Sequence, residues 1–139
     1  LPNNDEFDGK HRTLLILDNH MTEASDGVSN LFTKISHHRN VSVIFLTKNK
    51  YHKSKQARTM SLNTQYLVLF NNPRDVTQVA TLGRQMYPHN SKFLVVAFKD
   101  ATKRPYGYLL LDLRADTLEN YRVRTNIFAG ERQNVYIPK

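Results

Sequence analysis

Residues 14–23, LLILDNHMTE, carry four apolar side chains directly into an aspartate. A short apolar run of this kind predicts a buried strand that ends at Asp18. A carboxylate at a strand end can bind Mg²⁺ beside a nucleotide, or it can cap the helix that follows. The next residue is Asn19 and not a second acid. The stretch alone therefore leaves both roles open for Asp18, and it raises the question of whether the chain is catalytic.

Strands and helices alternate from this stretch onward. Strands are expected at residues 13–18, 41–47, 65–70, 106–113 and 121–128. Helices are expected from Thr22 to about His37, around 54–60, from Asn72 to Tyr87 and from Ser91 to Ala101. Within the last of these, the run FLVVAF, 93–98, taken alone would also suit a strand. Because the early strands are apolar on both faces, the alternation predicts a three-layer α/β sandwich around a mainly parallel sheet, with the last two strands as an antiparallel hairpin. We expect one domain at 12–139 after a flexible lead-in at 1–11.

Polar residues follow each of the first three predicted strands. They are Asp18 with Asn19, Thr47 to Asn49, and Asn71 with Asn72. The carboxyl ends of parallel strands meet at one edge of a sheet, and ligands bind there. The sequence therefore predicts a site at this edge.

The composition limits the chemistry that the chain can perform. Its 139 residues include no cysteine, which excludes disulfides, zinc-thiolate sites and cysteine nucleophiles. No stretch approaches the roughly 18 to 20 unbroken apolar residues of a membrane span, and the first residues lack an apolar signal core. We expect a soluble protein that is not exported and has no membrane partner. The chain starts at Leu1, so an upstream part is also possible.

The formal charge of +8 indicates a polyanionic partner, because clustered basic residues release counterions from phosphate backbones. Part of this charge gathers in KNKYHKSKQAR, residues 48–58. The predicted nucleic-acid-binding residues are Lys48, Lys50, Tyr51, Lys53, Lys55 and Arg58, with Tyr51 able to stack on an exposed base. The alternative is a solvated surface loop. Arg122 and Arg124 either extend this basic surface or pair with Asp112 and Asp116.

Six segments occur in a fixed order: LLILDNHMTE, LFTKISHHRNVSVIFLTKN, SLNTQYLVLFNNPRD, LGRQMYP, DATKRPYGYLLLDL and YRVRTNIF. In this order, from about residue 12 to residue 128, they resemble the C-terminal half of genome-packaging ATPases of the FtsK/HerA superfamily, especially those of Polinton-like and adintovirus-like elements. The resemblance implies part of a RecA-like P-loop core, with Mg²⁺ and ATP as cofactors of the intact family. It also implies double-stranded DNA as partner, a homo-oligomer or an upstream half, and an intracellular location that is nuclear or virion-associated.

The resemblance places Asp18 at the magnesium-binding Walker B position and Thr47 with Asn49 in the polar sensor element. Two departures weaken catalysis. Asn19 replaces the acid that polarises water, and an amide cannot accept a proton, so hydrolysis should fall by roughly 10²- to 10⁴-fold; Glu23 is a possible substitute. Lys48 replaces the usual glutamine, and an ammonium group donates hydrogen bonds but cannot accept them.

The resemblance also implies a trans-acting arginine near SHHRN, for which Arg39 is the candidate, although His37 occupies the aligned position. The alternative for Arg39 is a solvated helix end. The phosphate-binding sequence GxxxxGK[ST] is absent from the 139 residues. Without it, backbone amides that hold phosphates are missing, so we predict that this chain is not an ATPase by itself. In the family, the strand that carries this sequence would lie between the strands at 41–47 and 65–70. Without it, those two strands must pair directly, leave a groove or be completed by another chain.

Three functions compete on this basis. The first is a fragment or degenerate form of a DNA-packaging ATPase that acts in DNA binding or assembly. The second is a non-enzymatic domain that binds nucleic acid or protein. The third is a metal-dependent nuclease of the PIN/NYN type, in which Asp18 would join Asp75, Asp100 or Asp112 around Mg²⁺ or Mn²⁺.

Overall fold

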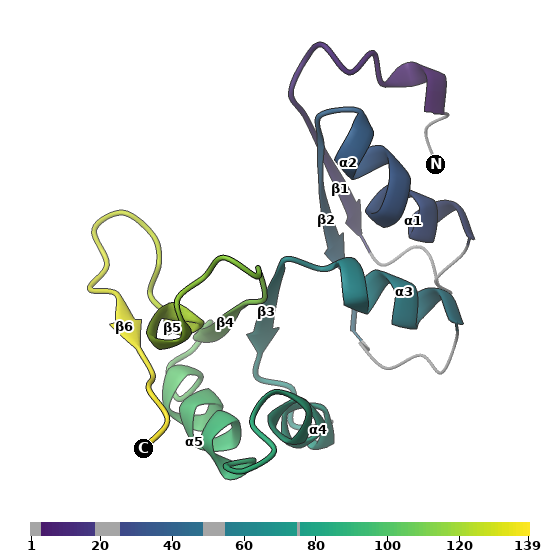
Figure 1. The fold of residues 1–139 in the computed structure, drawn as a ribbon. Helices are drawn as coiled ribbons and strands as arrows, with labels where there is room; N and C mark the ends of the chain where they lie inside the picture. The colour runs from purple at the N-terminus through teal and green to yellow at the C-terminus, as the bar shows by residue number, and fades with distance from the viewer. Residues whose placement is uncertain (1–3, 19–25, 49–54, 75) are drawn as a thin grey trace. The chain divides into compact units, whose positions relative to one another are not determined.

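The computed structural model describes residues 4–18, 26–48, 55–74 and 76–139 (Figure 1). The chain forms two compact units, residues 1–64 and residues 65–139, which are described separately. The first contains a two-stranded parallel sheet and the second a four-stranded antiparallel sheet. The protein is therefore mixed α/β, as the alternation predicts. No helix within the described ranges is long and apolar enough to cross a membrane.

The first unit is built around strands β1 (Thr13–Asp18) and β2 (Val41–Leu46), which pair in parallel. A helical run joins them and lies beside the two strands (Figure 1). Its parts are α1 (Asp26–Asn30), the π-helical segment η2 (Leu31–Ile35) and α2 (Ser36–His38). The short 3-10 helix η1 (Asn4–Glu6) precedes β1, and α3 (Lys55–Asn63) follows β2. The expected strand–helix–strand order of this region is confirmed.

One face of the β1–β2 pair is covered by the helical run. The buried core consists of Phe7, Leu31, Ile35 and Val41, against which Leu15, Leu17 and Val43 pack. Phe32 also meets Phe45 edge to face, with ring centroids 6.4 Å apart. Phe7 comes from the predicted lead-in, and its burial ties that segment to the core.

The other face of the same pair is apolar and exposed. Leu14 and Ile16 on β1 are 58% and 56% exposed, and Ile44 and Leu46 on β2 are 44% and 46% exposed. Ile16 is the register partner of Ile44, so these side chains lie side by side. Parallel sheets are usually covered on both faces. This bare face therefore sets the first unit apart from an ordinary parallel sheet.

The second unit has the strand order β3-β4-β5-β6, and every pair is antiparallel. The strands are β3 (Tyr66–Phe70), β4 (Tyr108–Asp112), β5 (Val123–Thr125) and β6 (Asn134–Val135). The helices are α4 (Thr77–Met86), α5 (Lys92–Ala101) and the 3-10 helix η3 (Glu119–Tyr121). The predicted helix at 91–101 and the predicted antiparallel hairpin of the last two strands are both confirmed.

Strand β4 forms the centre of the second unit, and all five of its residues are buried. Leu109 and Leu111 are fully buried, and α5 contributes Leu94 and Phe98 to the hydrophobic interior. Helices α4 and α5 approach closely at Gly83, where an added Cβ would lie 2.3 Å from the carbonyl oxygen of Ser91. Only a residue without a side chain fits at this contact.

Two predictions about the second unit are wrong. The sequence predicts β3 as a third parallel strand of one sheet, but β3 pairs antiparallel with β4 and does not pair with β2. Two helices connect β3 to β4. Compared with a single crossover helix, the second helix adds one more reversal of the chain direction, so β4 runs antiparallel to β3. The helix expected to begin at Asn72 begins instead at Thr77. The Asn72 side chain accepts a hydrogen bond from the Arg74 amide at 3.1 Å and so caps a turn.

A tight turn connects α5 to β4. The Gly107 amide donates to the Arg104 carbonyl at 3.0 Å, which closes the four-residue turn Arg104-Pro105-Tyr106-Gly107. Tyr106 has φ of 60°, the left-handed region, where turns with proline at the second position normally carry glycine. This conformation costs a residue with a side chain roughly 1–2 kcal/mol. Tyr106 is nevertheless 95% exposed, so packing within the fold does not offset that cost.

Candidate functional site

The carboxyl ends of β1 and β2 form a polar edge in the first unit. Asp18 is the last residue of β1, and its register partner is Leu46 on β2. Thr47 and Lys48 follow Leu46 directly, and all three polar side chains are exposed. A carboxylate, a hydroxyl and an ammonium group on neighbouring strand ends can hold a hydrated cation and a phosphate. The catalytic and metal-binding roles of these residues remain predictions.

The other predicted site residues are distributed over several parts of the sequence. Asn19, Glu23, Asn49, Lys50, Tyr51 and Lys53 lie outside the described residues. The backbones of Lys55 and Arg58 belong to α3. Asn71 and Asn72 follow β3 in the second sheet, so the prediction that they join Asp18 at one sheet edge is wrong. The cause is the antiparallel pairing of β3, which takes that strand out of the parallel sheet.

Arg39, the candidate trans-acting arginine, lies at the opposite end of the sheet. It follows α2 and comes two residues before β2 begins, and its Nη1 donates to the Phe7 carbonyl at 3.0 Å. The six residues of β2 separate it from the Asp18 edge, a span of roughly 20 Å at the rise of an extended strand. Arg39 therefore does not act on a ligand at the Asp18 edge of its own chain. A role at a neighbouring subunit stays a prediction.

The donor set at the edge limits how Mg²⁺ could be held. Among the described residues, no three His, Cys, Asp or Glu side chains gather into a metal-binding group. Mg²⁺ is commonly bound by one or two carboxylates together with waters and substrate phosphates. Asp18 fits the single-carboxylate form of such a site. Binding of the ion there would depend on the phosphates of a nucleotide.

Two of the acids that the nuclease hypothesis adds to Asp18, Asp100 and Asp112, are engaged elsewhere. Asp75 lies outside the described residues. Asp100 accepts hydrogen bonds from Lys103 at 2.8 Å and from the Tyr136 hydroxyl at 2.7 Å. Asp112 is fully buried among arginines of its own unit. Neither described carboxylate is an open metal ligand, which disfavours a nuclease site built on them.

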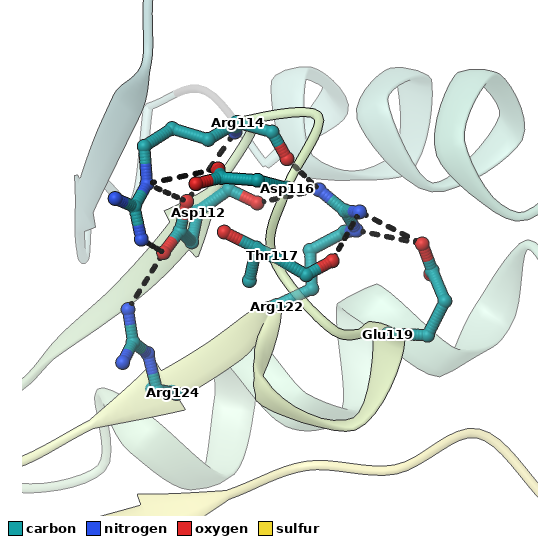
Figure 2. Close-up of polar contacts among 7 residues, drawn as sticks. All are labelled: Asp112, Arg114, Asp116, Thr117, Glu119, Arg122 and Arg124. Atoms are coloured by element: carbon teal, nitrogen blue, oxygen red, sulfur yellow. Dashed lines mark hydrogen bonds and ion pairs between the residues drawn. The ribbon is translucent and has the colours of Figure 1, made fainter.

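Asp112 is the centre of a buried ionic cluster in the second unit (Figure 2). Its Oδ1 accepts from Arg114 Nε at 3.1 Å, and its Oδ2 accepts from Arg114 Nη2 at 3.2 Å and Arg124 Nη2 at 2.9 Å. The sequence hypothesis that Arg124 pairs with Asp112 is therefore confirmed. Burial acts to raise the pKa of Asp112, but hydrogen bonds, foremost those from Arg114, outweigh it and hold the pKa below its ordinary value. The carboxylate is ionised at neutral pH.

Arg122 organises the loop next to this cluster. Its guanidinium donates to the carbonyls of Asp112 at 2.8 Å, Arg114 at 3.1 Å and Thr117 at 3.1 Å, and to the Glu119 carboxylate at 2.8 Å (Figure 2). The Arg122 side chain is only 15% exposed. Both arginines of the last predicted strand are thus structural, and the alternative that they extend a DNA-binding surface is not supported.

A small polar hollow lies between the end of α5 and strands β5 and β6. Its volume is about 180 Å³, and its lining includes Lys103, Arg104, Asn126, Asn134 and Tyr136. Arg104 donates to the side-chain oxygen of Asn126. Burial and the hydrogen bond to Asp100 raise the pKa of the Tyr136 hydroxyl. The hydroxyl therefore stays protonated at neutral pH and donates the hydrogen bond to Asp100. Sequence reasoning missed this hollow, although KRPYG signals a turn that carries two cations and a tyrosine.

Comparisons with known proteins do not place the chain in a family. No family model, no curated protein and no solved structure matches it.

Proposed function

We propose that this chain is the C-terminal half, or a degenerate form, of the RecA-like core of a genome-packaging ATPase, and that it acts in DNA binding or assembly. The observation that carries the proposal is the parallel register of β1 and β2, which pairs Asp18 with Leu46, the residue before Thr47. The resemblance requires a magnesium-binding carboxylate and a polar sensor on neighbouring parallel strands. In the complete protein, β1 and β2 would then belong to a mainly parallel three-layer sheet, whereas β3 lies in the antiparallel sheet of the second unit.

The exposed face of the β1–β2 pair supports an incomplete core. Four large apolar side chains, Leu14, Ile16, Ile44 and Leu46, are between 44% and 58% exposed on adjoining strands. Burial of apolar surface contributes roughly 25 cal/mol per Å², so such a face favours a covering layer. An upstream half with the phosphate-binding loop, or a neighbouring subunit, would supply this layer and further strands.

The charge distribution supports the DNA-binding part of the proposal. No aspartate or glutamate occurs between Asp26 and Asp75. This interval contains eight basic residues: Lys34, Arg39, Lys48, Lys50, Lys53, Lys55, Arg58 and Arg74. Lys48 lies two residues after the end of β2 and is exposed, and α3 begins at Lys55. Basic residues without neighbouring acids bind the phosphate backbone without reading its sequence.

Replacing Lys53 and Lys55 together with alanine is expected to weaken duplex DNA binding and its dependence on salt. If both lysines neutralise phosphates, the slope of log affinity against log salt should become shallower by about 1.8. Fluorescence anisotropy with a labelled duplex across a salt series measures this slope. The matched control is Lys92→Ala with Lys99→Ala, which removes the same charge from the exposed positions at the two ends of α5. An equal loss in both double variants would contradict a basic segment that binds DNA.

Mg-ATP is expected to produce no binding heat with this chain alone, because Asp18 lacks the backbone amides that hold phosphates. Isothermal titration calorimetry with and without Mg²⁺ tests this expectation, and Asp18→Ala serves as the comparison. Binding that disappears in Asp18→Ala would show that a nucleotide site exists without the usual loop. That result would overturn the inactive-alone part of the proposal and leave the DNA-binding part unaffected.

A further inference from the structure

The second unit presents a cationic and aromatic surface that the proposed function does not use. It consists of Lys103 and Arg104, the exposed ring of Tyr106, and the polar hollow that the two cations help to line. We call this set the Tyr106 turn. We propose that the Tyr106 turn is a binding site for single-stranded nucleic acid, with Tyr106 stacking on an unpaired base and Arg104 contacting a phosphate.

The first argument is the conformation of Tyr106. Its φ of 60° is one that side chains disfavour, and glycine would adopt it without strain at this point of the turn. At 95% exposure, the ring gains little from burial within the fold. Strained residues of this kind concentrate at binding sites, where their placement serves a ligand. The ring is thus displayed at a conformational cost and is open to an outside partner.

The second argument is the charge around the turn. Lys103 and Arg104 precede Tyr106 by three and two residues, and both line the hollow. The one acid of the lining, Asp100, is engaged by Lys103 at 2.8 Å and by the Tyr136 hydroxyl at 2.7 Å. Two cations against one acid leave the site net positive. Phosphate is a suitable ligand for Arg104, whose planar guanidinium presents several donors.

The third argument is the size of the hollow, which selects a polymer over a metabolite. Its volume of about 180 Å³ lies below the range of roughly 300 to 1,000 Å³ that is usual for small-molecule sites. It can admit a phosphate or part of a base but cannot enclose a nucleotide. The rest of such a ligand would lie outside the hollow. Base stacking on an exposed ring further requires an unpaired base, because bases in a duplex already stack on each other.

Labelled oligothymidylate of about 16 nucleotides, the upper end of common site sizes, is the probe for this site. Its binding to the whole chain is followed by fluorescence anisotropy across a salt series. Tyr106→Gly is expected to weaken binding by roughly 5- to 150-fold, the usual effect of losing one stacked base. Because glycine suits this turn, the thermal midpoint of Tyr106→Gly should equal or exceed that of the parent. Tyr106→Phe should retain binding, and Arg104→Gln should reduce the salt slope by about 0.7.

Tyr121→Ala, which removes a half-exposed ring from η3, is the matched aromatic control and should bind like the parent. Unchanged affinity in Tyr106→Gly would overturn the proposal, as would tighter binding of a phosphoserine peptide than of the oligonucleotide. The test is independent of the duplex experiment. The double variant Lys53→Ala with Lys55→Ala should not show the loss of oligothymidylate binding that Tyr106→Gly causes. Tyr106→Gly, in turn, should leave duplex binding unchanged.

Discussion

Asp112→Asn is expected to lower the free energy of unfolding by about 3 kcal/mol, the low end for breaking a buried ion pair. The substitution keeps the volume of the side chain but leaves Arg114 and Arg124 without the carboxylate that both contact. The Asp112 side chain is 1% exposed, whereas the Arg114 and Arg124 side chains are 40% and 21% exposed. The arginines can recover some hydration, which is why the low end applies. Urea denaturation monitored by circular dichroism measures the change.

Asp116→Asn is the matched control for this substitution. Asp116 lies 3.9 Å from Arg114, and its side chain is 79% exposed, so its loss should change stability by less than about 1 kcal/mol. Similar losses in the two variants would mean that the buried position of Asp112 is unimportant. That outcome would contradict the central role given to its cluster.

Asp112 also predicts how stability depends on pH. Its pKa in the folded protein lies below the ordinary value, so its ionised form favours the folded state. The contribution is complete above the pKa of the unfolded chain, about 3.9, and is lost as the pH falls through the lower folded pKa. The parent should therefore lose stability in acid. Asp112→Asn should show a smaller loss over the same interval, because asparagine does not titrate.

Gly83→Ala is expected to destabilise the second unit by about 1–3 kcal/mol, the usual cost of overpacking. Helix propensity alone predicts the opposite sign, since alanine favours a helix interior by about 1 kcal/mol over glycine. The close approach to α5 decides the outcome, because the new Cβ would lie 2.3 Å from the Ser91 carbonyl oxygen. A backbone atom cannot rotate away as a flexible side chain can. The helices must separate to make room.

Thermal unfolding of Gly83→Ala and of Gln85→Ala separates these two effects. Gln85 is an exposed residue of the same helix, so its replacement changes helix propensity without meeting α5. The glycine variant should have the lower midpoint. A midpoint above that of the parent would mean that helix propensity outweighs the contact and that α4 and α5 tolerate a wider separation.

Local features of the fold were predictable wherever one short-range signal acted alone. The apolar run before Asp18 and the β-branched run of 41–46 specify strands, and the four-residue spacing of apolar residues after Ser91 specifies α5. The pairing of Arg124 with Asp112 was also accessible from the predicted hairpin. Arg124 is the register partner of Leu110, and Asp112 lies two residues along β4 on the same face. These inferences require only the periodicity of the backbone.

Long-range pairing was less accessible. The apolar sequence of β3 suits either strand direction, and only the return of the chain through α4 and α5 makes β4 its antiparallel neighbour. Asn72 and Pro73 form a helix-start signal, but the Asn72 side chain closes a turn and the helix begins at Thr77. The exposure of Tyr106 likewise depends on tertiary structure, since a tyrosine before a strand can be buried or open.

Because one face of the β1–β2 pair is exposed, the stability of the first unit would depend on whether a binding partner covers that face. A partner that covers Leu14, Ile16, Ile44 and Leu46 binds the folded unit and not the unfolded chain, so its free concentration adds to the free energy of unfolding. At about 100 times the dissociation constant, this linkage supplies about 2.7 kcal/mol. Where such a partner exists, folding of the first unit and binding of that partner form one coupled equilibrium, and dilution of the partner lowers the stability of the unit.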